Sequence, residues 1–212
     1  MNKLPTLVIK DNNIWKGAIL RFDDHQDPSW SRRDGVPLRS DPLWLALKTA
    51  RARQRWDDHL PETIVEQEGV ELPSIDEWND AIPKSAWPIG MDGEPEPPWK
   101  RLYILYLLDI ATAEIFTFAN STKGARVAVT TLEDRWEWIP ALFGNAEIYP
   151  LVRPRDAPWR TKWGMRRRPD FEIVGYRKFA DGVLRRLDPG ATALIEPKRI
   201  SVGAAIDDDV PF

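Results

Sequence analysis

Two neighbouring strand patterns constrain the fold of this chain more than any other feature. Residues 101–109 carry apolar side chains on both faces of an extended chain. One face has Leu102, Ile104, Tyr106 and Leu108, and the other has Tyr103, Leu105 and Leu107. A second apolar run at 113–119 follows a turn at 110–112, so the two runs predict a β-hairpin. We expect both faces of the first run to be buried or covered by a ligand.

Three helices are expected around this hairpin. Asp41 and Pro42 are a typical N-cap and first-turn proline, and they predict a helix from Leu43 to about Trp56. The capping box at 74–77 predicts a short helix. A third helix is expected after the loop at 121–126, running through Leu132 and Trp136.

The remaining patterns define the domain organisation. Further strands are expected at 147–153 and 171–179, joined by a basic segment, whereas the proline-rich run at 83–98 predicts a loop or linker. We expect one domain over residues 1–200, with a helical and acidic insertion at about 41–98. A flexible acidic tail would follow at 201–212. The fold class is α+β or mainly β.

Composition excludes several classes of site. The chain of 212 residues has no cysteine and two histidines, which argues against disulfides, thiolate metal sites and histidine zinc sites. No apolar run approaches the length of about 20 residues that spans a bilayer. We therefore expect a cytoplasmic protein with no cofactor, no metal and no membrane partner.

Charge is segregated along the chain. The formal net charge is −3, but residues 57–97 hold twelve acids against one lysine, a net charge of −11. Residues 151–186 hold eleven bases against four acids, a net charge of +7. Without the three aspartates near the C-terminus, the chain has equal numbers of acids and bases, so these aspartates account for the whole formal net charge. This asymmetry predicts a surface that binds a polyanion.

The last six residues carry a specific signal. They are Asp207, Asp208, Asp209, Val210, Pro211 and Phe212. A terminal phenylalanine offers a ring and a carboxylate together, and the aspartates attract a basic partner surface. This ending resembles the tip of bacterial and bacteriophage single-stranded DNA-binding proteins. The blocks at 106–129 and 161–176 are similar to uncharacterised phage-type proteins.

The resemblance implies a function in DNA replication, recombination and repair. Such a tip recruits the proteins that carry out these processes, so it is the expected partner-binding site. A phage-encoded chain would work in the host cytoplasm. The first hundred residues do not match the bacterial proteins, so the tetrameric assembly of that family does not carry over and a homo-oligomer is left open.

A basic segment interleaved with aromatic residues is the first candidate for binding single strands, because bases stack on rings and phosphates pair with cations. It comprises Trp159, Arg160, Lys162, Trp163, Arg166, Arg167 and Arg168, with Tyr176 on the next strand. The second candidate is the hairpin, with Tyr106, Phe116 and Phe118 as a platform beside Lys123 and Arg126. A small barrel of these strands would be an OB-like core with helical insertions. Aromatic residues at strand spacing more often pack in the core, so a buried hairpin remains an alternative to a stacking platform.

Two other functions remain as alternatives. Asp109 and Glu114, or the cluster at 23–25, offer carboxylates for a metal-dependent nuclease, although no phosphate-binding glycine loop, nucleophile motif or histidine-pair zinc motif accompanies them. An adaptor that docks on replication proteins without binding DNA would need the tip alone. We expect a binding protein and no enzymatic activity.

Overall fold

The computed structural model describes residues 14–24, 27–56, 61–67, 69–90, 93–143, 147–161, 164–180 and 183–187. Its strands are β1 (Ala18–Asp23), β2 (Ser29–Arg32), β3 (Trp44–Trp56), β4 (Pro61–Val65), β5 (Trp99–Asp109), β6 (Ile115–Asn120), β7 (Ile148–Thr161), β8 (Gly164–Ala180) and β9 (Val183–Arg186). Its helices are α1 (Ile75–Asp80), the 3-10 helix η1 (Lys84–Ala86) and α2 (Lys123–Leu142). The protein is mainly β with helices added, as expected.

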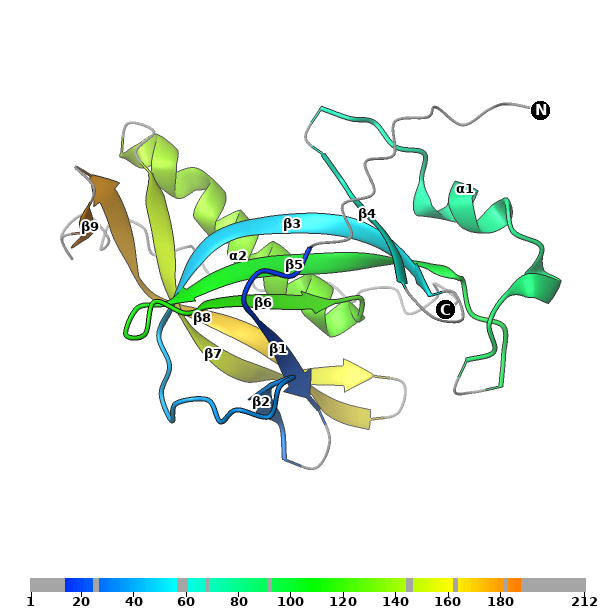
Figure 1. Ribbon diagram of the computed structural model, residues 1–212, viewed down its shortest axis with the longest axis horizontal. Coiled ribbons are helices and arrows are strands. Elements are labelled where there is room, and N and C mark those ends of the chain that lie inside the picture. Colours follow the sequence, from blue (N-terminus) through cyan, green and yellow to red (C-terminus); the bar gives the residue numbers. More distant parts are fainter. Residues whose placement is uncertain are drawn as a thin grey trace.

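The strands form one mixed sheet in the order β2-β1-β6-β5-β3-β7-β8-β9. β4 pairs with the C-terminal part of β3, and β7 pairs with the opposite end of β3. β1 runs parallel to β6, and the other pairs are antiparallel. β5 and β6 form the hairpin that the sequence predicts. In Figure 1, α1 lies at one end of the sheet and β9 at the other.

β5 is covered on both faces, because its apolar residues alternate as predicted. We call the face of the sheet that packs in the large core cluster the inner face, and the opposite one the outer face. The inner face belongs to a large core cluster that includes Val129 and Leu132 of α2. The outer face packs in a smaller cluster around Ile14. Between residues 101 and 108, the buried residues are Tyr103, Leu105 and Leu107 on the inner face, and Leu102 and Ile104 on the outer face.

The predicted helix from Leu43 to about Trp56 is wrong, because these residues form the central strand β3. β3 pairs with β5 from Trp44 to Arg55 and shifts register once, at Leu47. This shift places Trp44 and Ala46 in the inner cluster and Ala52 in the outer cluster. Residues 44–56 are therefore part of the main sheet rather than of an insertion.

The other two helices are present, but α2 begins at Lys123, within the segment at 121–126 that was expected to be a loop. α1 begins after Ser74, whose hydroxyl accepts a hydrogen bond from the Glu77 backbone N–H at 3.1 Å. α2 begins after Thr122, whose hydroxyl accepts a bond from the Ala125 N–H. Each cap satisfies one of the amides that a helix start leaves unpaired. In the part of the chain that the structure describes, no helix is long and apolar enough to cross a membrane.

The segment that carries α1 is held to the sheet by a buried polar contact. The guanidinium of Arg53, which is 3% exposed, lies 4.6 Å from the ring centre of Trp78 and donates to Glu66. The side chain of Asn79 bonds both the backbone N–H and the carbonyl of Trp99. These bonds anchor α1 to β3 and β5.

The sheet curls so that strands far apart in its order meet. The indole N–H of Trp30 on β2 donates to the Arg155 carbonyl of β7 at 2.9 Å. The Trp30 ring also lies 5.3 Å from the rings of Phe118 and Phe171, centre to centre. Four strands separate β2 from β7 in the sheet order. Side chains therefore close the curl between these two strands.

Candidate nucleic-acid interface

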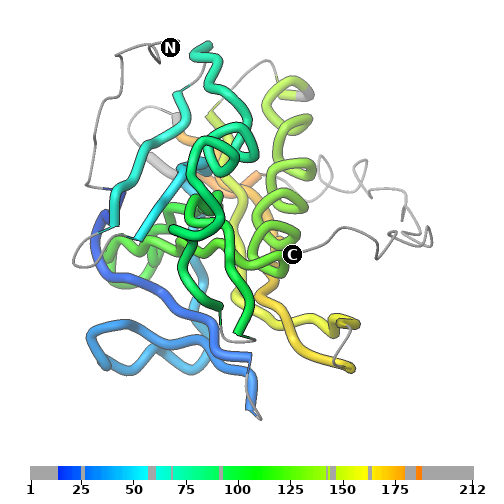
Figure 2. Tube along the Cα trace, turned by 90° about the vertical axis from the view of Figure 1, so that its right-hand side faces the viewer, coloured from blue at the N-terminus to red at the C-terminus, as the bar shows by residue number. Residues whose placement is uncertain are grey.

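The basic segment predicted to join two strands is itself a strand ribbon. β7 and β8 pair with each other as far as Thr161 and Gly164. β3 reaches only Leu151 and Val152 of β7, and β9 pairs with β8 only from Arg177 onward. Among the described residues, the half of the ribbon nearest its tip therefore pairs with no third strand. Figure 2 shows this yellow hairpin projecting from the body of the protein.

The ribbon register places the predicted binding residues on two faces. Trp159 lies directly opposite Arg166, and Ala157 lies opposite Arg168, so Trp159, Arg166 and Arg168 share one face. This face continues the outer face of the sheet, because Phe171, on the opposite side, belongs to the inner core cluster. Arg160 and Arg167 lie on the inner side of the ribbon.

Ion pairs neutralise much of the ribbon near the body. They are Arg153 with Asp41 at 2.8 Å, Arg155 with Glu172 at 3.0 Å, Arg168 with Asp170 at 3.0 Å, and Arg167 with Asp156. Arg160 and Arg166 are exposed and make no ion pair or side-chain hydrogen bond within the described ranges. The cations available to a ligand are therefore concentrated at the tip, beside the half-buried Trp159.

The start of α2 brings two more cations to the ribbon. A Cβ added at Gly124 would lie 2.9 Å from the Cβ of Arg168, so the helix start packs directly against β8. Lys123 and Arg126 flank this contact and are exposed. The N-terminal end of a helix attracts anions, which adds to the charge of these side chains. The structure thus joins the cations of both sequence candidates.

A hollow of about 570 Å³ lies between the turn after β1 and the ribbon. Pro28, Pro158 and Met165 supply apolar walls, and Asp24 and Arg167 are among its polar residues. Met165 is 67% exposed. The apolar walls match the faces of a nucleobase, and none of these walls had been singled out from the sequence. The hollow forms where the turn after β1 lies beside β7 and β8, and no local pattern reveals that proximity.

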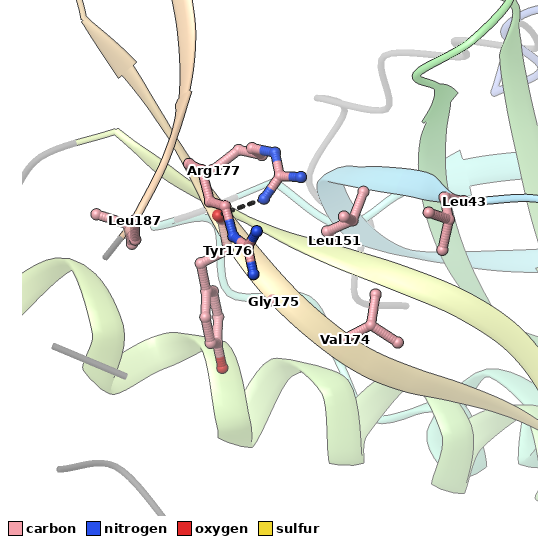
Figure 3. Close-up of a pocket in the computed structure, with 8 residues that line it drawn as sticks. Leu43, Leu151, Val174, Gly175, Tyr176, Arg177 and Leu187 are labelled. Carbon is pink, nitrogen blue, oxygen red and sulfur yellow. Dashed lines mark hydrogen bonds between the residues drawn. The ribbon is translucent and has the colours of Figure 1, made fainter. Parts of the chain in front are cut away.

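A second hollow, of about 390 Å³, lies at the end of the ribbon that is farthest from its tip (Figure 3). Leu43, Leu151, Val174 and Leu187 form its apolar lining, and Arg177 and Arg186 are its cations. Tyr176, predicted to stack on bases, points toward α2 in Figure 3. Burial raises the pKa of its hydroxyl, and nearby Arg135 partly opposes this. Its ring is half-buried.

The hairpin platform is not exposed. Phe116 is 3% exposed and Phe118 is 1% exposed, and both belong to the inner core cluster. Tyr106 packs on the outer face, and its hydroxyl donates to the Ile14 carbonyl at 3.0 Å. The assignment of Phe116 and Phe118 to a stacking surface is wrong, because both rings are buried and bases cannot reach them in this fold, whereas Tyr106 is half-buried.

Several predicted site residues lie outside the described residues. They are Lys162 and Trp163 of the basic segment, and Asp207, Asp208, Asp209, Val210, Pro211 and Phe212 of the C-terminal tip.

The carboxylates weighed for a nuclease have structural contacts. Asp109 accepts hydrogen bonds from the Ala111 and Thr112 N–H groups and so holds the turn after β5. Glu114 pairs with Arg32 at 2.8 Å. In the ranges that the structure describes, no three His, Cys, Asp or Glu side chains are grouped so that they could hold a metal ion.

Comparisons of the chain with models of protein families, with curated proteins and with solved structures find no match.

Proposed function

We propose that this protein binds single-stranded DNA without sequence preference and recruits replication, recombination and repair proteins through its C-terminal tip. One observation carries the DNA-binding part. Trp159 lies opposite Arg166 on a projecting ribbon whose tip cations are not neutralised by ion pairs among the described residues. A ring beside a free cation provides the two contacts that a single strand needs.

The proposed path of the strand follows the ribbon. Bases stack on Trp159, and phosphates contact Arg160 and Arg166 at the tip. Lys123 and Arg126 extend this charge at the start of α2. An OB-like barrel core is part of the proposal and is supported by the curl that brings β2 to β7.

Titration with an unlabelled thymidine oligonucleotide tests the proposal. We expect stoichiometric quenching of tryptophan fluorescence, because the chain has eleven tryptophans and one lies at the proposed contact. The affinity should fall steeply with salt, since bound phosphates release counterions. The oligonucleotide should stay intact when magnesium is added.

Two other results would contradict this reading. Cleavage of the oligonucleotide with magnesium would indicate the nuclease. Unchanged fluorescence together with no retention of the oligonucleotide would favour the adaptor, which uses the C-terminal tip alone.

The proposed role of the C-terminal tip leads to a separate prediction. Phe212→Ala should weaken capture of replication proteins from a bacterial lysate by about tenfold, because a terminal aromatic residue is the expected anchor of the contact. DNA affinity should stay unchanged. Immobilised wild-type and variant proteins, compared by quantitative pull-down, measure the difference. A Val202→Ala variant, which leaves all six tip residues intact, is the matched control, and equal capture by all three proteins would remove the recruiting function.

A further inference from the structure

The pairing of β8 with β9 places like charges directly opposite one another. Arg177 is the register partner of Arg186, and Lys178 is the register partner of Arg185. Like charges at such positions lower the stability of a sheet. Arg186 is exposed and makes no side-chain hydrogen bond or ion pair in the part of the chain that is described. Arg177 donates one bond, to the Tyr176 carbonyl. A bound anion between the two guanidinium groups would relieve this repulsion.

The hollow of about 390 Å³ adjoins these arginines. In Figure 3, Arg177 extends from β8 on the side away from α2, whereas Tyr176 points toward α2. Leu43, Leu151 and Val174 provide an apolar wall next to the charge. An anion with an attached apolar ring fits both parts of this site.

A register shift in β8 places this site on the same face as the ribbon tip. Ile173 pairs with Val152 and Gly175 pairs with Leu151, so Val174 is an extra residue on β8. Such a bulge reverses the alternation of the faces. Arg166 and Arg177 therefore both lie on the outer face, although they are eleven positions apart in the sequence. Ten strand steps span about 33 Å.

We propose that Arg177 and Arg186 bind a phosphate of the same DNA strand that contacts the ribbon tip, with an adjacent base in the hollow. This inference rests on the proposed function. About 33 Å corresponds to about ten stacked nucleotides at 3.4 Å each. Strand-binding surfaces take about 4–16 nucleotides, so one strand can reach both ends of the outer face.

The test is a variant that changes stability and binding in opposite directions. Arg186→Gln removes the repulsion and should raise the Tm by about 1–3 °C at low salt, with a smaller rise at high salt. It should weaken binding of a thymidine oligonucleotide of about 20 residues by about 2- to 5-fold. The slope of affinity against salt should fall by about 0.7.

Arg33→Gln is the matched control, because Arg33 is exposed after β2 and makes no ion pair among the described residues. It should change neither the Tm nor the affinity. If Arg186→Gln binds the oligonucleotide as wild type does, with an unchanged salt slope, the phosphate site is overturned while DNA binding by the ribbon stands.

Tripolyphosphate separates failure of this site from failure of the proposed function. It should raise the Tm of the wild type more than that of Arg186→Gln. If this difference appears but no oligonucleotide binds, both DNA binding and the strand-phosphate assignment are wrong. If tripolyphosphate raises both Tm values equally, the arginine pair is not an anion site, whatever the ribbon binds.

Discussion

Replacing Trp159 and Arg166 together by alanine should weaken binding of single-stranded DNA by about 30- to 100-fold. The two side chains are cross-strand neighbours on the outer face of the ribbon, so one nucleotide can contact both. Stacking contributes about 1–3 kcal/mol per base, and an exposed ion contact contributes up to about 1 kcal/mol. Fluorescence anisotropy of a labelled thymidine oligonucleotide at fixed salt measures the loss.

The control is a variant that loses the same two residue types elsewhere. Trp138 is 67% exposed on α2, and Arg33 is exposed after β2. Trp138→Ala with Arg33→Ala should retain wild-type affinity. Circular dichroism should show that both double variants keep the wild-type fold. If the folded ribbon variant binds DNA as tightly as the control, the ribbon tip is not the binding surface.

Replacing Trp30 by alanine should lower the free energy of unfolding by about 3–5 kcal/mol. Its ring lies among Phe22, Trp44, Phe118 and Phe171, with centre distances of 5.3 to 6.3 Å. Its indole N–H also holds β2 to the Arg155 carbonyl of β7. Removing the side chain leaves a cavity where the curl of the sheet closes. Urea unfolding followed by circular dichroism gives the change.

Trp30→Phe separates packing from hydrogen bonding. The phenylalanine ring keeps most of the apolar contact but cannot donate to Arg155. Apart from the effect of its smaller ring, Trp30→Phe should lower the free energy of unfolding by about 1 kcal/mol, because the hydrogen bond to Arg155 is lost. If the alanine variant unfolds with a loss below about 1 kcal/mol, Trp30 does not hold β2 against β7.

The hairpin of β5 and β6 could be predicted because its signal is local. Apolar residues on both faces between 101 and 109 indicate a buried strand whatever its neighbours are. The caps at Ser74 and Thr122 are also local, since each hydroxyl bonds an amide three residues later. Both helices therefore begin after these residues.

The strand β3 was mistaken for a helix because two local signals compete there. Alanine, leucine, lysine and arginine favour helices, and Asp41 with Pro42 is a typical helix start. The alternation of Ala50 and Ala52 with neighbouring arginines favours a strand. Pairing with β5 along eleven residue pairs decides the outcome, because tertiary contacts override weak intrinsic propensity.

By itself, the sequence determined the features that depend on neighbouring residues: the segregation of charge, the hairpin of β5 and β6, the helix start after Ser74 and the rings beside arginines in the basic segment. Only the tertiary structure decided which of those charges remain available. Asp41 neutralises Arg153 across 112 positions, and the extra residue Val174 turns Arg177 to the face of Arg166. Ion pairs and strand register depend on which segments meet in space, and short-range patterns do not record that choice.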